Sequence, residues 1–174
     1  MNLFELRERL IEFDEEILLL FEDKKFECVI VGGGAFLIMG FISRATMDID
    51  ILSASEEIIP FFDKYDMNMK VSELVFRFPY NYEDRLVKIE ISTKAVTYYS
   101  LSLEDLIVSK LYARRRKDQQ DIRTEEVIRN VDWIKLDNLI IEAELSALNK
   151  REYNELITSY EDYLLLKEWF YERT

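Results

Sequence analysis

Histidine is absent from the 174 residues of the chain. This absence excludes serine–histidine and cysteine–histidine catalysis, imidazole general bases and zinc sites with imidazole ligands. Carboxylates remain as the natural groups for metal binding and acid–base chemistry, and lysine and tyrosine are lesser options.

Cysteine occurs once, at Cys28, so the chain cannot form an internal disulfide. Cys28 lies in an apolar run, where we expect a small buried side chain and not a reactive thiol. Only four glycines and two prolines are present, which excludes low-complexity and collagen-like chains. No apolar run approaches the length of a membrane span, and the N-terminus shows no signal peptide. We therefore expect a cytoplasmic protein that does not enter a membrane.

Basic residues are fewer than acidic ones, 23 against 35, and the net charge is -12. Such a charge repels nucleic-acid phosphates and disfavours tRNA as a partner, although the basic run at 114–117 is a local exception. The negative charge is better suited to binding a small molecule or another protein, including a basic partner protein.

The apolar periodicity predicts an α+β fold, a small mixed β-sheet flanked by helices with a helical C-terminal part. Residues 1–100 would form the sheet-containing core with an N-terminal helix. Residues 101–174 would form helices packed on it in a single compact domain. The predicted strands are 26–31, 47–52, 68–78, 86–92 and 95–99. The predicted helices are 2–22, 35–42, Ser55 to about Tyr65 with a bend at Pro60, one beginning after a cap formed by Ser102 and Asp105, and then about 119–130, 136–148 and 150–172.

A glycine run, Gly32-Gly33-Gly34, follows the first predicted strand and opens a predicted helix. Glycine lets a ligand approach the backbone closely, and a helix N-terminus presents free N–H groups to phosphate. A tight strand-to-helix turn needs glycine for structural reasons as well. The run fits neither a dinucleotide fingerprint nor a P-loop.

Asp48 and Asp50 lie two residues apart in a predicted strand, so their side chains point to the same face. Ile49 and Ile51 then face the core, and both carboxylates project into a cleft. Two carboxylates held close repel each other unless a cation neutralises them, and Mg²⁺ takes such oxygen ligands together with phosphate oxygens. The alternative is two solvated acids on an edge strand.

The segment 110–121 combines basic and acidic residues. On one continuous helix, Lys110, Arg114 and Lys117 would line a single face that could neutralise a triphosphate. Asp118 and Asp121 follow at the spacing of one helical turn. The alternative is a solvated helix surface with paired charges.

Together these features resemble the polymerase-beta-like nucleotidyltransferase superfamily. The stretch VGGGAFLIMGFISRATMDIDIL is similar to its first motif, Gly-Gly followed by Asp-x-Asp. Within this stretch, Arg44-x-Thr46-x-Asp48-x-Asp50 resembles the form found in AbiEii-like and DUF6036-like bacterial nucleotidyltransferases. The stretch LSLEDLIVSKLYARRRKDQQDI resembles their second block, a helix with Lys and then Asp-x-x-Asp.

The resemblance implies a nucleotidyltransferase fold and a role for each matching residue. Asp48 and Asp50 would be catalytic and would bind two Mg²⁺ ions. Glu90, in the predicted strand 86–92, is the best match to the superfamily's third catalytic and metal-binding carboxylate, although that residue is usually aspartate. The residues that would contact the nucleotide are Gly32, Gly33, Gly34, Arg44, Thr46, Lys110, Arg114, Asp118 and Asp121.

The activity implied is transfer of a nucleoside monophosphate from an NTP to an acceptor, which could be a protein, tRNA or a small molecule. AbiEii-like families include toxins, so a partner toxin or antitoxin is also expected. The first alternative is a non-catalytic binding module of the same fold, which binds a nucleotide or a protein. The second is a lincosamide- or aminoglycoside-type resistance enzyme, in which aromatic residues of the tail wall an acceptor pocket. Aromatic residues of this kind are more often core or dimer contacts; here they are Tyr153, Tyr160, Tyr163, Trp169, Phe170 and Tyr171.

Overall fold

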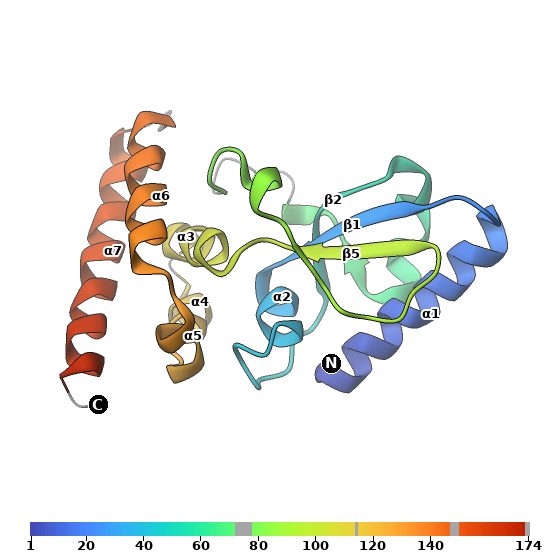
Figure 1. The fold of residues 1–174 in the computed structure, drawn as a ribbon, viewed down its shortest axis with the longest axis horizontal. Coiled ribbons are helices and arrows are strands. Elements are labelled where there is room, and N and C mark those ends of the chain that lie inside the picture. Colours follow the sequence, from blue (N-terminus) through green and yellow to red (C-terminus); the bar gives the residue numbers. More distant parts are fainter. Residues whose placement is uncertain (72–77, 114, 147–149, 173–174) are drawn as a thin grey trace. The chain divides into compact units, whose positions relative to one another are not determined.

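The structure is a computed structural model that describes residues 1–71, 78–113, 115–146 and 150–172 (Figure 1). The chain divides into two compact units. Of the described residues, the first unit contains 1–71 and 85–101, and the second contains 78–84 and 102–172. The predicted α+β class is confirmed: a mixed sheet is flanked by helices, and the C-terminal part is helical.

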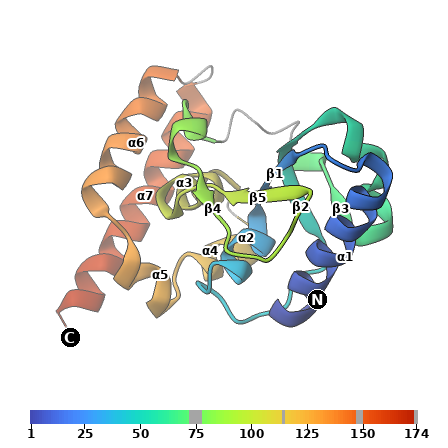
Figure 2. The same ribbon diagram turned by 45° about the vertical axis from the view of Figure 1, so that its right-hand side comes forward.

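The sheet of the first unit has the strand order β3-β2-β1-β5-β4 in the described residues, so β3 and β4 form its two edges (Figure 2). β1 pairs antiparallel with β2 and parallel with β5. β2 pairs parallel with β3, and β4 pairs antiparallel with β5. The strands are β1 (Phe26–Val31), β2 (Ile49–Ala54), β3 (Met67–Asn68), β4 (Val87–Lys88) and β5 (Val96–Ser100).

One face of the sheet forms the core of the first unit. Ile30 on β1 and Ile51 on β2 are paired in register, and both are fully buried. Helix α1 (Leu3–Phe21) packs there and buries apolar residues at helical spacing. The Tyr98 hydroxyl of β5 donates a hydrogen bond of 2.8 Å to the Leu10 carbonyl.

A buried carboxylate joins α1 to the beginning of β5. Asp14 is 3% exposed. It accepts hydrogen bonds from the backbone N–H groups of Lys94, Ala95 and Val96 at 2.7–2.8 Å. Three donors compensate the carboxylate for the water that burial removes. In the sequence, Asp14 looks like one more acid on an amphipathic helix.

Two further helices complete the first unit, α2 (Gly32–Ile38) and the 3₁₀ helix η1 (Glu56–Tyr65). Pro60 lies inside η1 and cannot donate a backbone hydrogen bond, which disfavours a regular α-helix there. The predicted strands 68–78 and 86–92 are longer than β3 and β4. Residues 72–77 of the first prediction lie outside the described residues.

The second unit is helical. Its helices are α3 (Leu103–Ala113), α4 (Arg116–Asp121), α5 (Glu125–Asn130), α6 (Trp133–Ser146) and α7 (Lys150–Tyr171), and a short 3₁₀ turn, η3 (Tyr82–Arg85), precedes β4. The predicted cap of α3 is present, because the Asp105 N–H donates to Ser102 Oγ at 3.3 Å. The predicted helix 119–130 is two helices, because Thr124 begins α5 by accepting the Val127 N–H.

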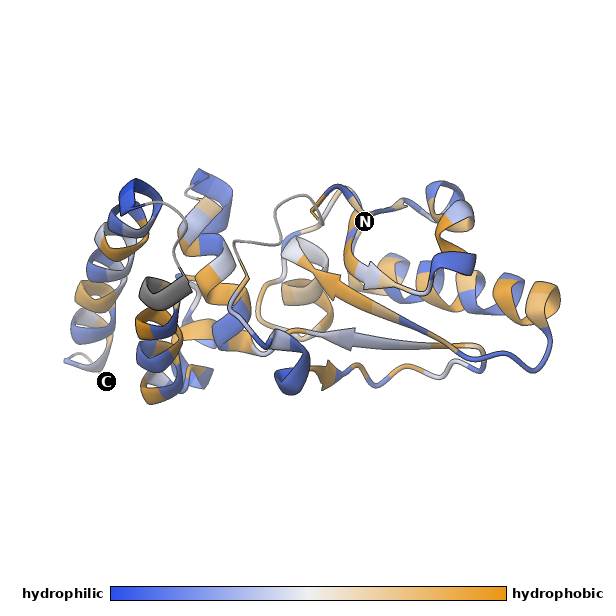
Figure 3. Ribbon diagram, turned by 90° about the horizontal axis from the view of Figure 1, so that it is seen from above, coloured by the Kyte–Doolittle hydropathy of each residue, from blue (hydrophilic) through white to orange (hydrophobic). Residues whose placement is uncertain are grey.

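Aromatic residues of α7 divide between core and surface. Tyr163 is fully buried and packs on Trp133, with ring centroids 5.5 Å apart. Tyr160 is also buried, and its hydroxyl donates to Asp137. Trp169 and Tyr171 are about half exposed, and polar and apolar residues alternate along α7 (Figure 3). Among the helices of the described residues, none combines the length and the apolar character required to cross a bilayer.

Candidate functional site

Strand β2 separates apolar from acidic side chains, as its alternation predicts. Ile49 and Ile51 are fully buried. Asp48, immediately before the strand, and Asp50, within it, are partly exposed. Both carboxylates contact the same neighbouring group, so they lie on one side of the strand.

That neighbouring group is the side-chain amide of Asn68 on β3, the strand that pairs with β2. Asn68 Nδ2 donates to Asp48 Oδ2 at 3.2 Å and to Asp50 Oδ1 at 3.4 Å. Its Oδ1 accepts the Lys70 N–H at 3.1 Å, which holds the nitrogen toward the carboxylates. No motif in the sequence indicates Asn68, because its position beside Asp50 depends on strand pairing.

The glycine turn lies directly against Asp50. Gly32 has φ +63°, a conformation that side-chain-bearing residues rarely adopt. A Cβ atom at Gly32 would lie 2.5 Å from Asp50 Oδ2, which is closer than real contacts allow. Gly34 instead lies in the core, where its Cβ would be 3.7 Å from Ile30 and from Leu6.

Arg44 and Thr46 lie against the next glycine. A Cβ atom at Gly33 would be 3.3 Å from Arg44 Nη2 and 3.3 Å from Thr46 Oγ1. Thr46 is buried and its hydroxyl donates to the Asp48 carbonyl at 3.1 Å, so it positions the backbone at the first aspartate. Gly32, Gly33, Arg44, Thr46, Asp48 and Asp50 are thus neighbours in the first unit.

Glu90 does not join this group. Its side chain is exposed, and it follows Ile89, whose N–H donates to Tyr98 on the β5 side of β4. β1 and β5 separate β4 from β2. Glu90 lies just after β4, whereas Asp48 and Asp50 lie at the beginning of β2. The structure thus does not bring Glu90 together with Asp48 and Asp50, and its role as a third metal ligand remains a prediction. Within the described ranges, no group of three or more acidic, cysteine or histidine side chains could hold a metal ion.

The second block of the sequence forms a buried charge cluster in the second unit. Lys110 is 4% exposed, and its Nζ donates to Asp118 Oδ1 and Asp121 Oδ2, both at 2.8 Å. Arg115 Nε donates to Asp118 Oδ2 at 2.6 Å. Both carboxylates are therefore paired with the Lys110 ammonium inside the second unit. Lys110, Asp118 and Asp121 are buried, so they do not form the solvated helix surface that was the alternative prediction.

The predicted basic face of a single helix is wrong. Helix α3 ends at Ala113 and α4 begins at Arg116, so Lys110 and Lys117 are not on one continuous helix. Lys117 is exposed. Arg114, the third predicted member of this face, lies outside the described residues.

The pKa of Asp118 depends on burial and on its two cationic neighbours. Burial raises the pKa of its carboxyl, but the hydrogen bond from Arg115 and the attraction of Lys110 outweigh burial. The pKa therefore lies below the ordinary value for aspartate.

Comparison with known proteins decides the family. A family model described as "Nucleotidyltransferase of unknown function (DUF6036)" matches residues 8–166. The chain belongs to this family. No curated protein and no solved structure matches the chain. The likeness to nucleotidyltransferases expected from the two aspartates and the glycine turn is thus confirmed at the level of the DUF6036 family.

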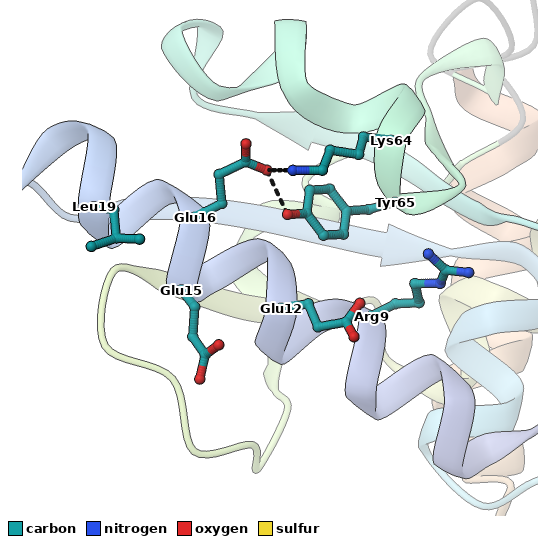
Figure 4. A pocket seen from close by; sticks show the side chains of 7 residues that line it. All are labelled: Arg9, Glu12, Glu15, Glu16, Leu19, Lys64 and Tyr65. Carbon is teal, nitrogen blue, oxygen red and sulfur yellow. Dashed lines mark hydrogen bonds and ion pairs between the residues drawn. The ribbon is translucent and has the colours of Figure 1, made fainter.

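A groove of about 520 Å³ lies elsewhere on this DUF6036 protein, along α1 and η1 (Figure 4). Its lining combines three glutamates with two basic residues, and within it Glu16 accepts hydrogen bonds from Lys64 and Tyr65. None of the predicted site residues lines it. The lining residues are Arg9, Glu12, Glu15, Glu16, Leu19, Lys64 and Tyr65.

Substitution of Gly32 by alanine should destabilise the first unit more than the same substitution at Gly40. Both glycines have positive φ, but a Cβ at Gly40 would meet nothing within 4 Å. Gly40→Ala should therefore lose only about 1–2 kcal/mol from backbone strain, and Gly32→Ala should lose more through the clash with Asp50. Urea unfolding measures both. Equal losses, or no recovery when Asp50→Gly is added to Gly32→Ala, would show that the turn does not abut the carboxylate.

Acidification should destabilise the second unit through Asp118. Because the folded-state pKa is lowered, the stabilisation is present above the ordinary aspartate pKa of about 4 and is lost as the pH falls through the folded-state value. The unfolding free energy should therefore decrease from about pH 5 downward, and decrease less steeply in Asp118→Asn. Helix circular dichroism during urea unfolding at each pH measures this, with exposed Glu126→Gln as the control. Identical slopes in Asp118→Asn and the unmodified chain would refute the assignment.

Proposed function

We propose that the chain is a metal-dependent nucleotidyltransferase that moves a nucleoside monophosphate from an NTP to an acceptor hydroxyl. The observation that supports this most strongly is the convergence of Asp48 and Asp50 beside Gly32. It occurs in a chain that belongs to a nucleotidyltransferase family.

The donor set of the two aspartates suits Mg²⁺. Asp48 Oδ2 and Asp50 Oδ1 face one point, since a single nitrogen of Asn68 lies within 3.2 and 3.4 Å of them. Mg²⁺ prefers carboxylate oxygens and commonly takes one or two of them together with substrate phosphates. Asp48 and Asp50 would hold the ion, which when bound supplies positive charge to the triphosphate and acidifies the attacking hydroxyl.

The surroundings of the aspartates suit a phosphate group. Gly32 and Gly33 carry no side chains, so a ligand can approach their backbone closely. The Arg44 guanidinium lies at Gly33, and arginine matches the geometry of phosphate oxygens with paired donors. Thr46 donates a hydrogen bond to the backbone carbonyl of Asp48. It would therefore contribute by fixing the position of that aspartate.

The reaction requires one bond to form and one to break. The acceptor oxygen bonds to the α-phosphorus, the bond from that phosphorus to the bridging oxygen breaks, and pyrophosphate leaves. In this scheme the hydroxyl proton passes to solvent.

The net charge of the chain favours some classes of acceptor over others. At a net charge of -12 the chain repels the phosphates of tRNA, so a protein or a small molecule is the favoured acceptor. The same charge favours a basic partner protein, which is compatible with a role in a toxin–antitoxin pair.

A nucleotide-binding module without transfer is the second candidate. It is favoured by the absence of a three-carboxylate group among the described residues. Two aspartates and an arginine would suffice to bind a metal–nucleotide complex, whereas transfer also requires acceptor activation.

Label from an α-³²P-labelled NTP should pass to an acceptor in the presence of Mg²⁺, whereas label from the γ-phosphate should not. The experiment incubates the protein with each NTP and with a protein extract, total tRNA or small hydroxyl compounds. Transfer should fall by at least about a hundredfold in Asp48→Asn, because a neutral amide replaces a metal-binding carboxylate.

Asp63→Asn is the matched control, since Asp63 is an exposed aspartate on η1. Transfer that persists in Asp48→Asn would contradict the enzymatic proposal. Mg²⁺-dependent NTP binding with no labelled product from any acceptor would support the binding module.

A further inference from the structure

Asn68 places an amide where two carboxylates converge. Its nitrogen is the shared donor to Asp48 and Asp50, so a cation that binds both of these oxygens from the same side would have to displace it. We propose that Asn68 is a positioning residue that competes with the divalent cation, so that the cation binds with the nucleotide and not before it. This inference rests on the proposed function and concerns the same site.

The orientation of the amide supports competition. Asn68 Oδ1 accepts the Lys70 N–H at 3.1 Å. For Oδ1 to bind a cation, the amide would have to turn over, and its NH₂ group would then face the Lys70 N–H. Two donors would oppose each other and the hydrogen bond would be lost. The backbone of Lys70 thus keeps the donor side of Asn68 toward the carboxylates.

Charge supports the same conclusion. Asp48 and Asp50 carry two negative charges, and Asn68 adds none. An amide donor reduces their repulsion in the free protein and so reduces the benefit that a cation brings. The NTP triphosphate supplies the further oxygen ligands and negative charge that make displacement of the amide favourable.

Replacement of Asn68 by aspartate would favour binding of the cation in the absence of the nucleotide. Asp and Asn have nearly the same shape, so one oxygen could still accept the Lys70 N–H. The other oxygen would face Asp48 and Asp50, and three carboxylates would repel each other until a cation bound. Substitution by alanine would remove the competing donor without adding a charge.

Titration of the full chain with Mn²⁺, followed by electron paramagnetic resonance, tests the proposal. The unmodified protein should bind Mn²⁺ weakly alone, and at least tenfold more tightly with an α,β-methylene NTP analogue. Asn68→Asp should bind Mn²⁺ at least tenfold more tightly than the unmodified protein without the analogue. In EDTA, the thermal unfolding midpoint of Asn68→Asp should be lower than that of the unmodified protein. When Mn²⁺ is added, the midpoint of Asn68→Asp should rise by more than that of the unmodified protein.

Asn68→Ala separates competition from ligation and serves if Asn68→Asp does not fold. If the amide competes, Asn68→Ala binds Mn²⁺ more tightly than the unmodified protein; if the amide is a ligand, it binds more weakly and the inference is overturned. Equal affinities of the unmodified protein and Asn68→Asp would overturn it too, while analogue-dependent Mn²⁺ binding would leave the proposed function intact. Failure of the unmodified protein to bind Mn²⁺ even with the analogue would instead contradict the proposed function.

Discussion

The convergence of two carboxylates on the Asn68 amide is the constraint on which the candidate site depends. The Asn68 amide donates to both Asp48 and Asp50, and Gly32 has no side chain to displace Asp50. Thr46 holds the backbone from which Asp48 projects. The buried Ile49 and Ile51 anchor the same segment in the core. Core packing thus presents the acidic pair at the glycine turn.

Local patterns predicted much of this arrangement. Strand β1 matches the predicted residues 26–31, because the run is short, apolar and followed by glycine. The alternation around Asp50 placed isoleucines in the core and carboxylates on the other side. Strand order was not predictable, because pairing between distant segments leaves no mark in a single sequence. Asn68 was therefore missed, and Glu90 was assigned to the site although it lies near the opposite edge of the sheet.

Charged residues show a second limit of sequence patterns. The spacing of Lys110, Asp118 and Asp121 is compatible with a solvated helix and with a buried ion-pair cluster, and only the structure shows the buried cluster. The break between α3 and α4 then separates Lys110 from Lys117. Asp14 is a second example of a buried charge that the sequence does not reveal, because its three backbone donors come from residues about eighty positions away. Removing one partner of such a buried charge is costly, because the remaining charge is left uncompensated.

Anomalous scattering from Mn²⁺ in crystals grown with a non-hydrolysable NTP analogue would test the central claim most directly. The account predicts a peak about 2.1 Å from carboxylate oxygens of both Asp48 and Asp50, next to Gly32, with the Asn68 amide displaced. A nucleotide bound elsewhere, with no peak at the aspartates and the Asn68 nitrogen still between them, would contradict it.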